Sequence, residues 1–307
     1  MKPEEVKELF VGPVGTVPTP FDSDFEIDHG RMAELTKWWV ANGLVKRKAV
    51  IKVAAAMGEG PMLSDDELPA LVRTVVQAGD DKAAIVSGLG YKDTKRTIED
   101  AKRIQDMGAI ALQVTPPIFN LPTQDDILRF YGDLSDAVDI GIMVYVTKSM
   151  YTPIYMDTYR KMADFENVIA VKWGAVVGEY EDIFELADRF NIIDNGIGPV
   201  GCHKLGGKGF ITTTADIHPP HELRVWELCE NKQYEEAQAL SESVEGPLGK
   251  LFARVGERTG GQSVGKKGLM AAMGRPCGDS RPPSGAMNEE EMAELRGLLR
   301  GFGWPVP

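Results

Sequence analysis

The chain of 307 residues carries 34 basic and 46 acidic residues, which gives a formal net charge of −12. This charge argues against nucleic acid or an anionic membrane as the main partner, because each needs a basic surface to bind to. Apolar residues make up 43% of the chain, which is ample for a large core. No apolar run approaches the roughly 18 residues of a membrane-spanning helix.

The cysteines and the N-terminal segment both predict a cytoplasmic protein. Cys202, Cys229 and Cys277 are widely spaced and form no C-x-x-C pair. An odd number of isolated cysteines is typical of free thiols in a reducing compartment, not of a disulfide framework. Residues 1–10 are charged and lack the apolar segment of a signal peptide.

Short apolar runs alternate with segments of helical periodicity from the first strand onward. The expected strands cover residues 14–21, 49–56, 83–88, 109–115, 140–146, 168–174, 191–197 and 209–214. The expected helices cover residues 29–42, 64–79, 93–107, 123–138, 154–165, 179–190 and 199–205, and a long helix starts at residue 221. Eight strands alternating with eight helices predict an α/β fold, the (β/α)₈ TIM barrel.

An open doubly wound sheet is the competing architecture. It requires a glycine-rich phosphate loop after the first strand, and residues 19–22 do not form one. We therefore expect a barrel over residues 1–230 and a C-terminal helical extension over residues 231–307, packed together as one structural unit. The extension contains helical segments at 247–255, 263–273 and 288–302.

The most informative stretch is Val168–Gly174, where four apolar residues run directly into Lys172. A run of this length and composition predicts a buried parallel strand. At the mouth of a barrel a lysine is partly desolvated, which favours the free amine. A free amine can attack a ketone and form a Schiff base. The alternative is a strand-end lysine that simply reaches into water.

Tyr145 ends the preceding expected strand, so it is predicted to point toward the same mouth as Lys172. Chemistry in such barrels lies at the carboxyl ends of the strands. A phenol beside an imine-forming lysine can transfer protons between carbinolamine, substrate and water. The alternative role for Tyr145 is an aromatic side chain at the barrel rim.

Other strand ends supply candidate binding groups. Gly58, after Met57, allows a backbone N–H to approach a carboxylate closely. Ser87 and residues 212–214 offer hydroxyl groups, although capping of the strand ends explains them equally well. The pair His218 and His221 lies at a loop-to-helix junction and does not predict a metal site.

Taken in order, these residues resemble the dihydrodipicolinate synthase / N-acetylneuraminate lyase family of Schiff-base lyases. The similarity covers nearly the whole chain. The matching motifs are Pro18–Phe21, Met57–Glu59, Pro116–Pro117, Pro122–Gln124, Tyr145, Val171–Gly174, Leu205–Thr212 and Arg281–Pro283. The resemblance implies that Lys172 is the Schiff-base lysine, that Tyr145 is the catalytic tyrosine, and that the protein forms a homotetramer or a homodimer.

The departures from the family pattern concern substrate binding. The usual Gly-[Ser/Thr]-Thr-Gly-Glu motif is Ala55–Glu59 here, so Ala56 and Met57 replace two hydroxyl residues. Phe119 stands where the synthase has a tyrosine, and Met150 stands where it has an arginine. Lys148 is a candidate replacement for the missing positive charge. The predicted substrate-binding residues are Ala56, Met57, Gly58, Phe119, Lys148, Gly196 and Ile211.

The leading hypothesis is a cofactor-free and metal-free lyase that forms a Lys172 imine with a 2-keto acid or a deoxy-oxo sugar acid. The segments 1–7, 18–21, 63–73 and 88–91, together with Gly12, resemble the branch of 5-dehydro-4-deoxyglucarate dehydratases, so dehydration is slightly favoured. A pyruvate-dependent class I aldolase is the first alternative. A non-catalytic barrel that binds a small acid is the alternative of another class, and the lost hydroxyls favour it.

Overall fold

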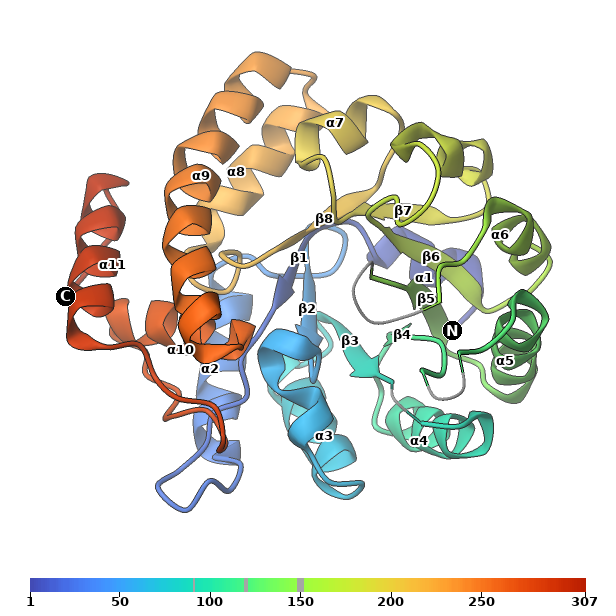
Figure 1. Ribbon diagram of the computed structural model, residues 1–307, viewed down its shortest axis with the longest axis horizontal. Coiled ribbons are helices and arrows are strands. Elements are labelled where there is room, and N and C mark those ends of the chain that lie inside the picture. The colour runs from blue at the N-terminus through green and yellow to red at the C-terminus, as the bar shows by residue number, and fades with distance from the viewer. Residues whose placement is uncertain (91, 119–120, 148–151) are drawn as a thin grey trace.

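A computed structural model describes residues 1–90, 92–118, 121–147 and 152–307 of the chain. Within them, parallel strands pair in sequence order and β8 returns to β1, so the sheet closes into a barrel (Figure 1). The strands are β1 Gly12–Thr16, β2 Val50–Val53, β3 Ala84–Leu89, β4 Ala111–Val114, β5 Gly141–Tyr145, β6 Val168–Trp173, β7 Asn191–Asp194 and β8 Gly209–Thr212. The predicted TIM barrel is confirmed.

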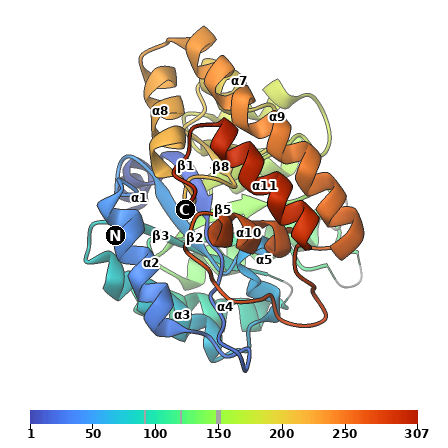
Figure 2. The ribbon, with the colours of Figure 1, turned by 90° about the vertical axis from the view of Figure 1, so that its left-hand side faces the viewer.

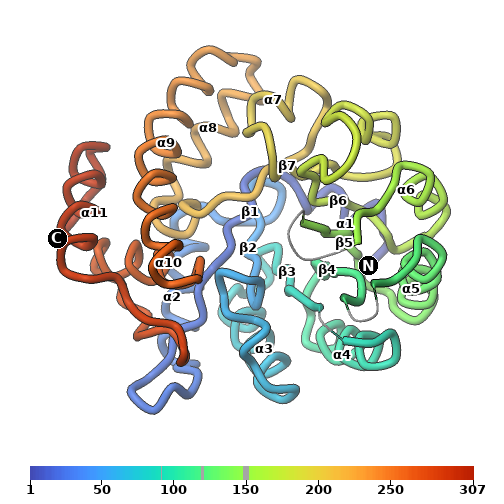
Figure 3. Tube along the Cα trace, in the orientation of Figure 1, coloured from blue at the N-terminus to red at the C-terminus, as the bar shows by residue number. Residues whose placement is uncertain are grey.

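Helices surround the barrel in the order in which the chain reaches them (Figure 3). They are α2 His29–Ala41, α3 Glu67–Gly79, α4 Thr94–Asp106, α5 Gln124–Ala137, α6 Met156–Met162, α7 Pro199–Lys204 and α8 Pro219–Glu230. Three 3₁₀ segments complete this part of the chain, η1 Ala56–Gly58, η2 Gly60–Met62 and η3 Tyr180–Leu186.

Two local expectations are wrong. The α-helix expected over 179–190 is the shorter 3₁₀ segment η3. The N-terminal segment, for which no helix was expected, forms α1 Pro3–Leu9. In α1, Val6 and Leu9 are buried against apolar residues inside the barrel, including Ile169. Two apolar residues are too short a periodic pattern to predict a helix. Packing against the barrel stabilises this short helix.

The C-terminal extension consists of α9 Tyr234–Thr259, α10 Gln262–Ala272 and α11 Glu289–Gly301. Figure 2 shows α10 and α11 beside α9, and all three pairs of these helices are in contact. The boundary predicted at Pro247 is wrong, because α9 continues through it. A buried stripe along α9 that includes Val244, Leu248 and Leu251 offsets the missing backbone donor of Pro247.

The barrel interior changes from apolar to polar along its axis. Val50, Ala111 and Ala170 belong to the interior apolar cluster. Because side chains alternate between the two faces of a strand, the residues two positions further along also point inward. These residues are Lys52, Gln113 and Lys172, and with Ile211 of β8 they form one layer contributed by alternate strands. A polar layer therefore lies below the carboxyl ends of the strands.

Among the described residues, no helix is long and apolar enough to cross a membrane.

Candidate active site

Lys172 and Tyr145 lie together at the carboxyl ends of β6 and β5. They are directly paired in the strand register, and the Lys172 Nζ atom lies 3.7 Å from the centre of the Tyr145 ring. Lys172 is 8% exposed and Tyr145 is half-buried. The phenol ring thus covers the amine, and the geometry joins the two residues that were predicted to act together.

The surroundings of Lys172 favour its uncharged form. Burial lowers the pKa of Lys172 to about 7, because an ammonium group loses its hydration inside the barrel. Within the described part of the chain, Lys172 makes no ion pair that would restore the charge. A substantial fraction of free amine is therefore present near neutral pH, as nucleophilic attack requires.

The predicted binding residues Ala56, Met57 and Gly58 form η1, directly after β2. Ala56 is exposed, Met57 is half-buried and Gly58 is buried. The Gly58 carbonyl accepts a hydrogen bond from Thr19 Oγ1 at 2.6 Å, and a Cβ atom on Gly58 would lie 2.7 Å from the Val17 carbonyl oxygen. This close packing requires glycine and fixes the loop against β1.

The same loop is strained and held from the C-terminal extension. Ala54 and Glu59 both have positive φ angles, 51° and 56°, which are uncommon for residues with side chains. The Glu59 carboxylate lies 3.0 Å from Lys267 Nζ and accepts a hydrogen bond from the Arg281 backbone N–H at 2.9 Å. The extension therefore fixes the conformation of the rim that follows β2.

A cavity of about 280 Å³, here called the β2–β5 cavity, opens at the carboxyl ends of β2 to β5. Tyr145, Gln113 and Thr115 supply its polar groups near the barrel axis. The Thr115 hydroxyl is buried and makes no hydrogen bond within the described residues. Directly after β2 the wall of this cavity is formed by Ala54–Ala56, whose side chains offer no hydroxyl.

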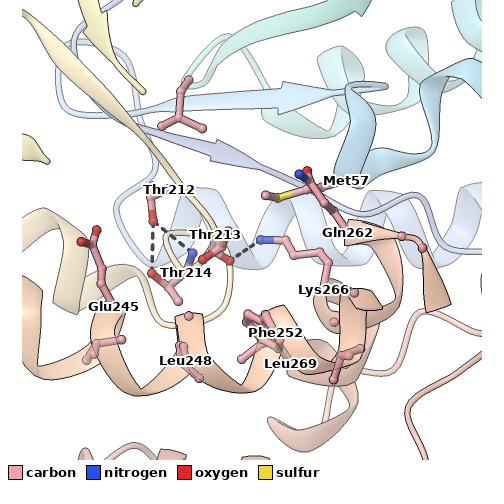
Figure 4. A pocket seen from close by; sticks show the side chains of 18 residues that line it. Met57, Thr212, Thr213, Thr214, Glu245, Leu248, Phe252, Gln262, Lys266 and Leu269 are labelled. Atoms are coloured by element: carbon pink, nitrogen blue, oxygen red, sulfur yellow. Dashed lines mark hydrogen bonds between the residues drawn. The ribbon is translucent and has the colours of Figure 1, made fainter. Parts of the chain in front are cut away.

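A second cavity of about 490 Å³, the β8–α9 cavity, lies between the barrel rim and the extension (Figure 4). Met57 and Ile211, two of the predicted substrate-binding residues, line its barrel side. Its outer wall is largely apolar and comes from α9 and α10. The apolar residues of that wall are Val244, Leu248, Phe252, Val255 and Leu269.

The threonine hydroxyls at the end of β8 serve mainly the local turn. Thr212 Oγ1 accepts a hydrogen bond from the Thr214 backbone N–H at 3.0 Å and lies 3.1 Å from Thr214 Oγ1 (Figure 4). Thr214 Oγ1 in turn donates to buried Glu222, whose pKa burial raises to about 7. The capping interpretation of these threonines therefore agrees with the structure better than direct substrate binding. Ser87 likewise donates to the neighbouring Gly88 carbonyl.

Gly196 lies in the loop between β7 and α7, which Asp194 organises. The Asp194 carboxylate accepts hydrogen bonds from the backbone N–H groups of Gly196, Ile197 and Gly198 and from the Tyr180 hydroxyl. Gly196 is exposed at the rim. Phe119 and Lys148, the other two predicted binding residues, lie outside the described residues, as does Met150.

Three polar residues of the site escaped the sequence analysis. They are Lys52, Gln113 and Thr115. Each lies in or just after a strand that is otherwise apolar, and a polar residue in such a run signals an inward-facing group in a barrel. Lys52 and Gln113 are connected by a hydrogen bond of 2.8 Å.

The described residues hold no cluster of three or more His, Cys, Asp or Glu side chains placed to bind a metal. His221 is buried at the start of α8, with its ring centre 5.7 Å from that of Trp304.

Comparison with known proteins identifies the family. The model of the dihydrodipicolinate synthetase family matches residues 9–301. The chain belongs to the dihydrodipicolinate synthetase family. It is 27% identical to the 4-hydroxy-tetrahydrodipicolinate synthase of Heliobacterium modesticaldum, over 93% of each chain. It is 33% identical to the enzyme of the same name from Chlorobium chlorochromatii, over 66% of this chain and 68% of that one.

The fold agrees with solved structures of the family. The crystal structure of dihydrodipicolinate synthase from Aquifex aeolicus superposes with a TM-score of 0.84, at 22% identity, over 97% of this chain and 99% of the other. The relatives named above are synthases, so the lean toward the dehydratase branch receives no support from them.

Proposed function

We propose that the protein is a lyase that binds a 2-keto acid as an imine on Lys172. The supporting observation is the buried Lys172 amine against the Tyr145 ring, with a pKa lowered to about 7 by burial. The free amine attacks the keto carbon and forms a carbinolamine. Loss of the former keto oxygen as water then gives the imine.

Tyr145 is the proposed proton carrier of this reaction. Its phenol delivers the proton with which the carbinolamine oxygen leaves as water, and then takes a proton from the carbon next to the imine. The resulting enamine is a carbon nucleophile. Attack on an aldehyde forms a carbon–carbon bond, and hydrolysis of the imine releases the product and restores Lys172. Cleavage is the reverse sequence.

The β8–α9 cavity reaches the barrel rim at Met57 and at Ile211, which lies in the same layer as Lys172, and its lining supports aldol-type chemistry over dehydration of a sugar acid. A polyhydroxylated substrate needs many hydrogen-bonding groups, whereas the outer wall of this cavity is formed largely by apolar residues such as Leu248 and Phe252. We therefore propose pyruvate, or a close 2-keto acid, as the first reactant. The second is an aldehyde whose remainder is apolar.

The test is reductive trapping with cyanoborohydride and pyruvate, followed by peptide mass analysis. The expected result is an adduct on the peptide that contains Lys172 and none in Lys172→Ala. An aromatic aldehyde should then be consumed faster than glyceraldehyde in the presence of pyruvate. Absence of an adduct would contradict the imine mechanism. Equal thermal stabilisation of wild type and Lys172→Ala by pyruvate, without turnover, would favour a binding protein instead.

A further inference from the structure

Lys52 is a buried lysine inside the barrel for which the mechanism above has no use. It is 1% exposed, and it lies on β2 in the same interior layer as Lys172. Its ammonium group donates a hydrogen bond to Gln113 Oε1 at 2.8 Å. A neutral amide oxygen is a weak partner for a buried cation, since it carries no opposite charge.

Other enclosed lysines of the chain have carboxylate partners. Lys266 pairs with Asp216, Lys267 with Glu59, and Lys92 with Asp65 and Asp100. No carboxylate among the described residues pairs with Lys52. Burial lowers the pKa of Lys52 far below its usual value, and the nearby charges of Lys172 and Lys266 lower it further. An anion brought in by a ligand would offset these costs.

Gln113 connects Lys52 to the place where substrate enters. Its side chain lines the β2–β5 cavity together with Tyr145. Because Gln113 Oε1 accepts the hydrogen bond from Lys52, the amide Nε2 group is left as a donor, and it has no acceptor among the described residues. When a bound anion keeps Lys52 protonated, the charge behind the amide would strengthen that donor.

The segment at the end of β2 leaves an anionic substrate without hydroxyl donors. Ala54–Ala56 face the same cavity and provide no hydroxyl for an anion. Lys92, which lines the cavity, is already paired with two carboxylates. Among the residues that the structure describes, Lys52 behind Gln113 is therefore the buried amine without a carboxylate partner that an arriving anion would hold in its protonated form, besides Lys172 itself.

We propose that Gln113 and Lys52 bind the carboxylate of the keto acid, with the Gln113 amide as the donor and Lys52 as the positive charge behind it. This inference rests on the proposed function, because it assigns the anionic end of the same substrate. It explains how a chain of net charge −12 holds an anion without the hydroxyl groups that it lacks on β2.

The experiment compares pyruvate with pyruvamide, which has the same ketone but no charge. Reductive trapping on Lys172 is measured against the concentration of each compound, in wild type and in Lys52→Met. The half-saturating concentration of pyruvate should rise roughly 10- to 100-fold in the variant, as for the loss of a charge-assisted contact. The value for pyruvamide should stay unchanged, and the exposed control Lys37→Met should change neither.

Equal weakening of both compounds in Lys52→Met would overturn the inference, since it would mean that Lys52 acts on Lys172 or on the fold. No change with either compound would overturn it as well. Thermal unfolding checks that the variant folds, and Lys52→Gln is the second neutral variant if Lys52→Met does not.

A wild-type chain without any adduct would contradict the proposed function instead. The carboxylate site is then judged by the rise in melting temperature that pyruvate causes. Lys52→Met must abolish that rise, and pyruvamide must not cause it; any other result overturns the inference.

Discussion

Two pairs of buried lysines in this protein have opposite surroundings. Lys266 and Lys267 on α10 each lie against a buried carboxylate, Asp216 and Glu59 respectively. Lys52 and Lys172 inside the barrel have no such partner among the described residues; Lys52 contacts an amide oxygen and Lys172 an aromatic ring.

The difference separates a structural role from a chemical one. Burial also lowers the pKa values of Lys266 and Lys267, but the Asp216 and Glu59 carboxylates oppose that shift and favour the charged form. Such a pair connects segments that are distant in sequence; Lys266 also donates to the Thr213 carbonyl, which joins α10 to the end of β8. An unpaired buried lysine loses its proton easily and can then react as a nucleophile, or it keeps the proton when a bound anion supplies the missing counter-charge. The following predictions test this separation, in order of decreasing effect.

The largest effect is expected from Asp216→Asn. This change leaves the Lys266 ammonium buried without a counter-charge, and the free energy of unfolding should fall by about 3–5 kcal/mol. Urea denaturation measures it, with exposed Asp24→Asn as the control that should change little. A loss as small as that of the control would show that Lys266 does not depend on its partner.

Glu59→Gln should have the next largest effect. It removes the charge opposite Lys267 and weakens the acceptor of the Arg281 backbone N–H, so we expect a loss of about 1.5–3 kcal/mol. Because Glu59 fixes the loop after β2, trapping of pyruvate should also weaken. A destabilised protein with unaltered trapping would mean that the loop conformation is irrelevant to binding.

Unlike the two changes above, Lys172→Met should raise the free energy of unfolding at neutral pH, by about 1 kcal/mol. The same variant should abolish trapping. The pKa of Lys172 is about 7 in the folded chain against 10.5 as its ordinary value, so between these pH values only the unfolded chain keeps the proton. Wild-type stability therefore rises with pH across this window.

Lys172→Met has no lysine at this position and so lacks this pH-dependent rise in stability. The difference in unfolding free energy between variant and wild type should therefore shrink as the pH is raised from 7 toward 10. Paired urea titrations of wild type and variant at several pH values give this difference directly. An advantage that does not change with pH would mean that Lys172 remains charged in the folded chain.

Much of the fold and the central pair of the site could be predicted from sequence. The alternation of apolar runs and helical periods specifies the barrel, and the position of Lys172 after a buried strand places it at the rim beside Tyr145. Local sequence patterns predict helices less well where packing against the rest of the fold determines whether a helix forms or continues. α9 continues through Pro247 because its buried stripe continues, and α1 forms because the barrel interior accepts Val6 and Leu9.

The rest of the site depends on contacts across the fold. Lys52 and Gln113 are 61 residues apart, and Glu59 reaches Lys267 and Arg281 from the opposite end of the chain. No local sequence pattern encodes such pairs. Lys52 could have been noticed as the single charged residue of an apolar strand. Its partner Gln113 and its orientation toward the barrel interior, however, are known only once the barrel is closed.

The central claim is that Lys172 is a free amine near neutral pH and forms the imine. The direct measurement is the rate of cyanoborohydride trapping of pyruvate on the Lys172 peptide as a function of pH. The rate of imine formation should rise with pH and level off above a midpoint of about 7, where the amine loses its proton. A midpoint near the ordinary lysine value of 10.5, or an adduct on another residue, would contradict the account.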